Sequence, residues 1–147
     1  MPYLYYEAAA LKALGREREA SEINGRLANM KDVGMWNMGG EFTYYSAMSI
    51  RLAGDEMRAQ RIMREAILAW EKELQQCSQY YSAAVGDFIC FIGDNLRGER
   101  LAALYGMLGY GKLYNGDPAG AKELFTKSLS LVPANTKIAF ELSLLEN

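Results

Sequence analysis

The sequence predicts an all-α protein built from pairs of antiparallel helices, and three observations lead to this fold class. Three segments repeat one spacing, in which a small residue is followed by glycine after seven positions and by alanine after five more. The stretches around these residues carry the apolar period and end signals of amphipathic helices. Signals for β-strands are nearly absent.

Each copy of this spacing predicts a helical hairpin. The small residues are Ala8, Ala47 and Gly109, the glycines are Gly15, Gly54 and Gly116, and the alanines are Ala20, Ala59 and Ala121. The first small residue lets two helices approach closely, and the alanine faces it from the second helix. The glycine supplies the left-handed residue at which the first helix ends.

The expected helices, in chain order, are 3–14, 17–30, 42–53, 56–75, 98–114, 119–132 and 136–146. Asp117 is a natural N-cap with Pro118 at the first helical position. The last helix should cap the exposed end of the array. Its apolar face is expected to hold Ile138, Ala139, Leu142 and Leu145, with Lys137, Glu141 and Glu146 outside that face.

The third copy resembles the tetratricopeptide repeat, because it carries Leu108, Gly109, Gly116, Asp117, Pro118, Ala121, Phe125 and Pro133 in the family's order. The first two copies keep only the small–Gly–Ala frame. The resemblance implies an α-α superhelix, one domain over 1–147 with repeats at about 3–30, 42–75 and 98–132, and a capping helix at 136–146.

Two stretches break the period of the repeat. The first two copies are 39 residues apart, whereas the standard unit has 34. The additional residues form a loop in which Met35, Trp36 and Met38 lie among glycines. We expect this loop to fold back onto the helices; the alternative is a partner surface. The second gap leads us to expect an irregular segment at 77–96, interrupted by Gly86 and Gly93, or else a worn fourth repeat.

A second resemblance concerns this gap and the repeat after it. The run is similar to the tail of large bacterial proteins that join a β-rich N-terminal region of unknown function to C-terminal tetratricopeptide repeats. The residues that carry it are Tyr80, Ala84, Asp87, Phe88, Phe91, Asp94 and Leu96, while Gly86 departs from a proline favoured by those proteins. The resemblance implies a bacterial fragment of a larger protein, with no defined activity.

Composition argues against several classes of partner and reaction. A net charge of −2 without a basic run argues against nucleic acid, and no apolar run is long enough for a membrane helix. Without a secretion signal at the start, a cytoplasmic location is expected, although a fragment of a longer chain would look the same. There is no histidine, the commonest general base and zinc ligand, and no nucleophile frame such as G-x-S-x-G. We therefore predict no enzyme activity, no catalytic or metal site and no cofactor.

The tetratricopeptide resemblance implies a concave groove lined by the first helix of each hairpin. The groove positions are Tyr5, Ala9 and Lys12, then Tyr44, Met48 and Arg51, then Gly106, Tyr110 and Leu113. The candidate ligand-binding residues among them are Tyr5, Lys12, Tyr44, Met48, Arg51 and Tyr110. The clamp for acidic chaperone tails needs lysine and asparagine at several places where this chain has Tyr5, Ala9, Tyr44 and Met48, so that ligand is not expected.

Rigid tyrosines beside basic side chains suit an apolar or mixed peptide. The leading hypothesis is therefore a protein-interaction scaffold that recognises a peptide, a protein or another domain of its parent chain. One alternative is an accessory module of a carbohydrate-active protein, and another is a homodimer formed through Met35, Trp36 and Met38. The tyrosines could also simply pack between neighbouring repeats.

Overall fold

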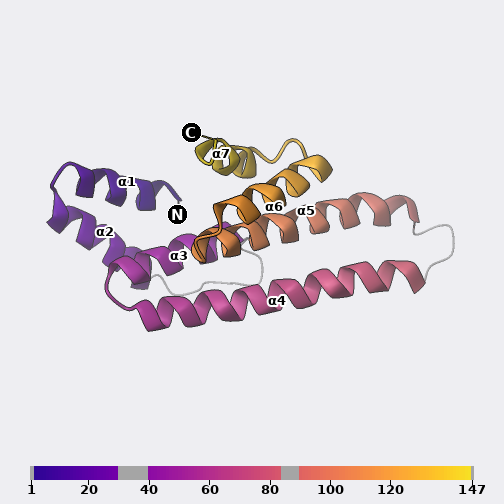
Figure 1. Ribbon diagram of the computed structural model, residues 1–147, viewed down its shortest axis with the longest axis horizontal. Coiled ribbons are helices and arrows are strands. Elements are labelled where there is room, and N and C mark those ends of the chain that lie inside the picture. Colours follow the sequence, from indigo (N-terminus) through magenta and orange to yellow (C-terminus); the bar gives the residue numbers. More distant parts are fainter. Residues whose placement is uncertain (1, 30–39, 84–89, 147) are drawn as a thin grey trace. The chain divides into compact units, whose positions relative to one another are not determined.

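A computed structural model describes residues 2–29, 40–83 and 90–146, with side chains left undescribed at 2, 29, 78–83 and 90–97. Every regular element in these ranges is a helix, which confirms the all-α prediction (Figure 1). In chain order they are α1 (Pro2–Ala13), α2 (Glu17–Asn29), α3 (Gly40–Leu52), α4 (Glu56–Ala83), α5 (Cys90–Tyr114), α6 (Pro118–Leu131) and α7 (Thr136–Leu144). None of the described helices combines the length and apolar character needed to cross a membrane.

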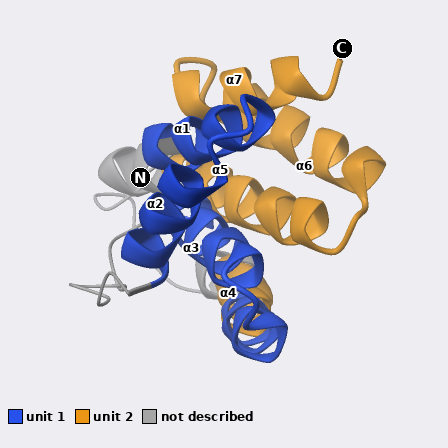
Figure 2. Ribbon diagram, turned by 90° about the vertical axis from the view of Figure 1, so that its left-hand side faces the viewer, with its two compact units in different colours: residues 1–66 blue, residues 67–147 orange. Residues whose placement is uncertain are grey.

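The chain divides into two compact units, Met1–Ala66 and Ile67–Asn147, where the sequence analysis expected a single domain (Figure 2). The boundary falls inside α4. With 28 residues, α4 extends about 42 Å at 1.5 Å per residue. A helix of this length continues well beyond its own hairpin, so it contributes its first turns to unit 1 and the remainder to unit 2.

The helix bounds agree with the predicted ones to within two residues at most ends. The exception is the predicted irregular segment at 77–96, which is wrong at both of its ends, because α4 continues to Ala83 and α5 already begins at Cys90. No glycine or proline lies within α4, and a helical glycine such as Gly93 or Gly98 costs only about 1 kcal/mol. Residues 84–89, and the loop with Met35, Trp36 and Met38, lie outside the described residues.

The three hairpin turns have the same backbone geometry. Gly15, Gly54 and Gly116 have φ of 75°, 96° and 75°, the left-handed conformation predicted for them. In the first turn, Gly15 N–H donates to the Lys12 carbonyl at 3.0 Å and Arg16 N–H donates to the Leu11 carbonyl at 2.9 Å. The other two turns repeat this pair of bonds. The pattern is the Schellman ending of a helix, which satisfies carbonyls that the helix end would leave unpaired.

The second helix of the third hairpin begins as the sequence predicts. The Asp117 carboxylate accepts a hydrogen bond from Gly120 N–H at 2.9 Å, and Pro118 is the first helical residue. Asp55 plays the same part in the second turn, where its carboxylate accepts from Arg58 N–H at 3.1 Å. Both side chains satisfy an N–H group that has no partner inside the helix.

The small residues of the repeated spacing are all buried, as predicted. Ala8, Ala20, Ala47, Ala59 and Ala121 are at most 3% exposed, and Gly109 is buried as well. The contact at Gly109 is especially close: a Cβ there would lie 2.4 Å from the ring of Phe125. Helices α5 and α6 therefore pack at a distance that only glycine permits at this position.

The last helix, α7, packs on α6 and covers part of α5 with a face that differs from the predicted one. Ile138 is buried as expected, but Glu141, placed outside by the sequence analysis, is 6% exposed, and Ala139 is exposed. The reason is a hydrogen bond: the Tyr110 hydroxyl donates to Glu141 Oε1 at 3.4 Å. A buried hydroxyl usually has such a partner, so the Glu141 carboxylate lies inward while Lys137 and Glu146 stay exposed as predicted.

Candidate functional site

Four tyrosines from α1 and α3 meet in unit 1, and we call them the tyrosine cluster: Tyr5, Tyr6, Tyr44 and Tyr45. Tyr45 is at the centre and 1% exposed. Its ring centroid lies 5.0 Å from those of both Tyr5 and Tyr44, and its hydroxyl lies 2.7 Å from that of Tyr6. Helices α1 and α3 contact one another, so the first helices of two consecutive hairpins lie side by side.

The predicted groove residues of unit 1 lie around this cluster on one face. Tyr5, Tyr44 and Met48 are half-buried, whereas Ala9 and Lys12 are exposed. Spacings of four and three residues place Tyr5, Ala9 and Lys12 on one side of α1. We define the α1–α3 groove face as Tyr5, Ala9, Lys12, Tyr44 and Met48. Lys12 lies in the last turn of α1, where a cation is favoured by the helix dipole.

Arg51, the remaining candidate of unit 1, is bound to the hairpin turn. Its guanidinium donates two hydrogen bonds to the Glu56 carboxylate, at 2.8 and 2.9 Å. These bonds, and a further one from Gln60, lower the pKa of Glu56 below its ordinary value. The pair joins the end of α3 to the start of α4. Arg51 therefore fixes the turn, and Lys12 is the cation that the groove face presents.

Tyr110, the candidate residue of unit 2, is covered by α7. It is 2% exposed, its hydroxyl is bonded to Glu141, and its ring meets that of Phe125 edge to face with 5.3 Å between centroids. Ile138 reaches Gly106, where a Cβ would lie 3.0 Å from Ile138 Cδ1. The face of α5 that corresponds to the groove is thus occupied by a helix of the same chain, and Tyr110 packs instead of facing a ligand.

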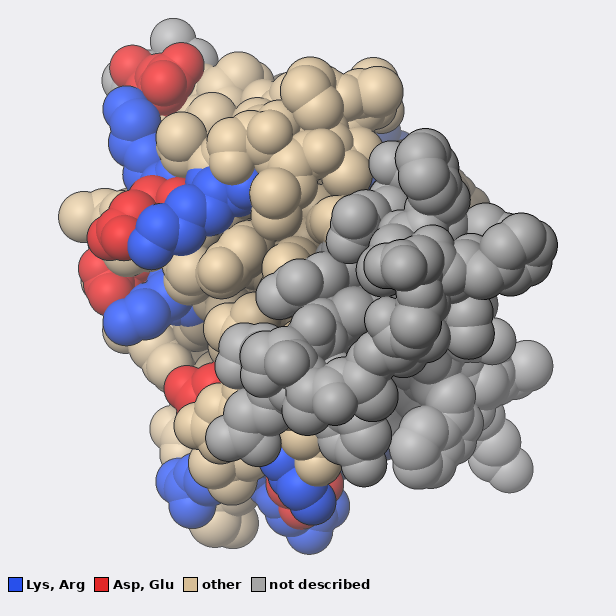
Figure 3. Space-filling view, turned by 90° about the vertical axis from the view of Figure 1, so that its right-hand side faces the viewer, with Lys and Arg blue, Asp and Glu red and all other residues tan. Residues whose placement is uncertain are grey.

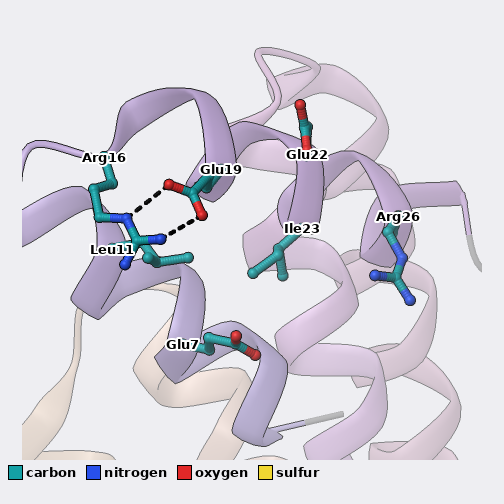
Figure 4. Close-up of a pocket in the computed structure, with 7 residues that line it drawn as sticks. All are labelled: Glu7, Leu11, Arg16, Glu19, Glu22, Ile23 and Arg26. Atoms are coloured by element: carbon teal, nitrogen blue, oxygen red, sulfur yellow. Dashed lines mark hydrogen bonds and ion pairs between the residues drawn. The ribbon is translucent and has the colours of Figure 1, made fainter.

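Sequence reasoning missed a depression between α1 and α2, with a volume of about 240 Å³ (Figure 4). It is lined by Glu7, Leu11, Arg16, Glu19, Glu22, Ile23 and Arg26. Arg16 donates two hydrogen bonds to Glu19 at one end, which raise the pKa of Arg16 and lower that of Glu19. The only sequence signal was the mixed charge of Arg16 to Glu22, which is typical of a solvated helix face.

The depression and the groove face lie on different sides of α1. Glu7 and Leu11 each follow a groove residue, Tyr5 or Ala9, by two positions, and two residues correspond to about 200° around a helix. The depression offers three carboxylates and two guanidinium groups around two aliphatic side chains, and no Ser, Thr, Cys or Lys side chain lines it. The groove face, with its aromatic rings, is therefore the better candidate for recognition.

Outside the groove face and the depression, acidic and basic side chains are mixed along the described surface. On the face shown in Figure 3, the described acidic and basic side chains alternate along one edge and do not gather into a patch of one sign. Among the described residues, several ion pairs join side chains only three to five positions apart, such as Lys127 with Glu123. Within the described ranges, no three Asp, Glu or Cys side chains come together as a metal site would require.

Comparison of the chain with protein-family models, with the curated proteins and with the solved structures finds no match in any of the three. The tetratricopeptide resemblance, the resemblance to large bacterial proteins and the cytoplasmic location therefore stay predictions. The functional argument depends on the groove face itself.

Proposed function

We propose that this chain is a non-catalytic protein-interaction module, whose ligand is a segment of another protein or of its own parent chain and binds the α1–α3 groove face. The observation that carries the proposal is the tyrosine cluster, in which half-buried rings from two helices surround a fully buried one. The central ring fixes the outer rings before any ligand arrives.

This preorganisation favours binding. Aromatic side chains supply a large contact area, and rings already held in place lose little further freedom when a ligand is bound. Met48, beside Tyr44 on α3, adds a flexible apolar side chain that adapts to different partners. Lys12 places a positive charge at one end of this apolar surface. The combination fits a peptide with apolar side chains and at least one carboxylate.

The test begins with a peptide library displayed on phage and selected against the purified chain. The affinity of the selected peptides is then measured by fluorescence anisotropy for the native chain and for a Tyr44→Ala, Met48→Ala double variant. Met57→Ala is the matched control, because Met57 is 84% exposed and lies on α4 outside the groove face. Circular dichroism verifies that both variants keep their helices.

We expect the double variant to bind the selected peptides at least about tenfold more weakly, the size of effect that truncation of contact residues at an interface centre produces. The Met57→Ala control should bind as the native chain does. If the double variant keeps full affinity for every selected peptide, the groove face is not the binding site and the proposal is wrong.

A further inference from the structure

In the second and third copies of the repeat, a preceding helix packs on the first helix of the hairpin. The residue two positions after the small residue of the frame is Ser49 in α3 and Gly111 in α5. A Cβ at Gly111 would lie 2.8 Å from Ile67 Cγ1, so α4 packs on α5 at this position. Ser49 is fully buried, and α3 contacts α2. The second helix of one hairpin therefore lies against the first helix of the next in both cases.

The equivalent side of α1 is exposed. Ala10 takes the place of Ser49 and Gly111, and it is exposed. Tyr3 and Leu14 are 70% and 73% exposed. At 100° per residue, both lie within about 40° of Ala10 around the helix. Together these residues form the outer side of α1, which we define as Tyr3, Glu7, Ala10, Leu11 and Leu14.

The depression between α1 and α2 adjoins this outer side, because Glu7 and Leu11 line it (Figure 4). In the second hairpin, Ile50 takes the place of Leu11 and is 3% exposed. Arg58 takes the place of Glu19 there, and its guanidinium donates to the Ala28 carbonyl of α2 at 3.4 Å. The surface that holds the end of a preceding helix in the second hairpin is thus a depression in the first.

Two charged side chains of this surface are unpaired. Among the described residues, neither Glu7 nor Arg26 has a hydrogen-bond or ion-pair partner. Glu7 also distinguishes the first copy from the other two, which have Ser46 and Leu108 at the equivalent position. A helix that docks on the outer side of α1 is therefore complementary if it places a cation opposite Glu7.

We propose that the outer side of α1 binds a helix of a partner protein, which lies on α1 as α4 lies on α5. Along α4, Ile67 meets Gly111. Glu73, further along α4, accepts a hydrogen bond from Arg100, which lies earlier in α5. The two helices therefore run antiparallel, and so does the partner helix relative to α1. The site continues an interface that recurs within the chain, and it lies on a different side of α1 from the groove face.

The partner is a separate protein and not a second copy of this chain. The second helices of the three hairpins, α2, α4 and α6, already pack on α3, α5 and α7. A second copy therefore has no second helix to offer, whereas an exposed apolar side on α1 marks a place for one.

The size of Ala10 and the charge of Glu7 define two side chains of the partner helix. Ile67 fits closely on Gly111 because glycine has no Cβ, whereas the residue of α2 that corresponds to Ile67 is Ala28. Since Ala10 has a Cβ, we expect alanine or serine against it. In an antiparallel pair, the residue one turn further along the partner helix meets Glu7, one turn back along α1. Lysine or arginine is expected there.

The probe is a synthetic peptide of residues 63–76 from α4, with Ile67→Ala and Trp70→Lys. A free peptide of this length is only marginally helical, so a hydrocarbon staple replaces Leu68 and Lys72, which are exposed and one turn apart. The matched control peptide carries the same staple and keeps Ile67 and Trp70. Fluorescence anisotropy gives the affinity of each peptide for the full chain.

We expect the modified peptide to bind about tenfold more tightly than the control peptide. Ala10→Arg and Leu14→Lys in the protein should each weaken its binding about tenfold or more. Ser21→Arg, at an exposed position of α2 outside the depression, should leave it unchanged. Circular dichroism verifies that all three variants keep their helices.

A charge swap tests the pairing with Glu7. Glu7→Lys in the protein should weaken the peptide with Trp70→Lys. A peptide with Trp70→Glu should show the reverse preference and bind the Glu7→Lys protein better than the native one.

Three outcomes would overturn the inference. One is no binding of the modified peptide. Another is binding that both Ala10→Arg and Leu14→Lys leave intact, which would mean that the peptide exchanges with α4 in unit 2. The third comes from analytical ultracentrifugation: if the native chain self-associates and Ala10→Arg abolishes the association, the occupant is a second copy. The proposed function is tested separately, because its binding depends on Tyr44 and Met48.

Discussion

The first and third hairpins end their first helices with the same glycine turn, yet different residues fill the space between their helices. Counting four positions beyond the alanine of each second helix gives Asn24 in α2 and Phe125 in α6, and both side chains are buried. Phe125 packs against Gly109 and Tyr110. Asn24 instead buries a side-chain oxygen that has no hydrogen-bond partner among the described residues.

The comparison shows that the small–Gly–Ala frame and the residue enclosed between the helices, Asn24 or Phe125, contribute differently to each hairpin. The frame fixes the turn and how closely the helices approach, and it is common to both hairpins. The enclosed residue sets how much apolar surface leaves water and whether a polar group is left unsatisfied. The third hairpin is therefore filled by an aromatic ring and covered by α7, whereas unit 1 combines an unsatisfied amide oxygen in its first hairpin with a half-buried aromatic face.

The largest effect is expected from Phe125→Ala. Removing a fully buried ring should lower the free energy of unfolding of the α5–α6 hairpin by about 3–5 kcal/mol. Hydrogen exchange measured by mass spectrometry should show the loss of protection in α5 and α6. Leu131→Ala, at a 43% exposed position of α6, is the control and should change protection little. Equal losses in both variants would refute the central role of Phe125.

Replacing two glycines of α5 by alanine should change the free energy of unfolding in opposite directions. At Gly109 the new methyl group would lie 2.4 Å from the buried Phe125 ring, so we expect a loss of about 1–3 kcal/mol from overpacking. At Gly98 nothing lies within 4 Å, so Gly98→Ala should stabilise α5 by up to about 1 kcal/mol through helix propensity. Urea denaturation of both variants measures the difference, and a shared sign would contradict the close packing at Gly109.

In the first hairpin, Asn24→Leu should be stabilising. The change replaces a buried amide oxygen without a partner by an apolar group of similar size, and we expect a gain of about 1 kcal/mol in the stability of unit 1. Protection of α1 and α2 against hydrogen exchange should rise. Ser21→Leu, at an exposed position of α2, is the control for added hydrophobicity. A loss of stability would show that Asn24 makes a polar contact on which the packing of the first hairpin depends.

The smallest effect concerns the pH dependence of the third turn. The Gly120 N–H and then Lys112 lower the pKa of Asp117 below its ordinary 3.8. Because the folded state has the lower pKa, the carboxylate stabilises α6 above pH 3.8, and this contribution is lost as the pH falls through the folded value. Asp117→Asn keeps the N-cap acceptor without the titration. Thermal melts from pH 5 to pH 2.5 should therefore fall less steeply for Asp117→Asn than for the native chain.

Much of this fold could be predicted from the sequence, because the responsible residues act locally. Glycine is the residue that adopts a left-handed turn without strain, so Gly15, Gly54 and Gly116 marked the ends of three helices. Asp117 and Pro118 marked the start of another. The same local rules failed at the ends of 77–96, where α4 continues to Ala83 and Gly93 lies inside α5, because the weak propensity of a single residue is offset along a long helix.

Only part of the candidate site could be predicted from the sequence. The repeated spacing predicted that Tyr5, Lys12, Tyr44 and Met48 lie on first helices, and the tetratricopeptide resemblance made them groove candidates. Neither could show that Arg51 pairs with Glu56 or that Tyr110 is covered. Tyr110 and Glu141 are 31 residues apart, and their hydrogen bond turns a carboxylate inward that amphipathic pattern placed outside. Turn geometry and close helix approach are encoded by single residues. Which helix face is covered depends on distant segments that meet in space, and there the hydrogen bond of a buried group such as the Tyr110 hydroxyl decides which side chains lie inward.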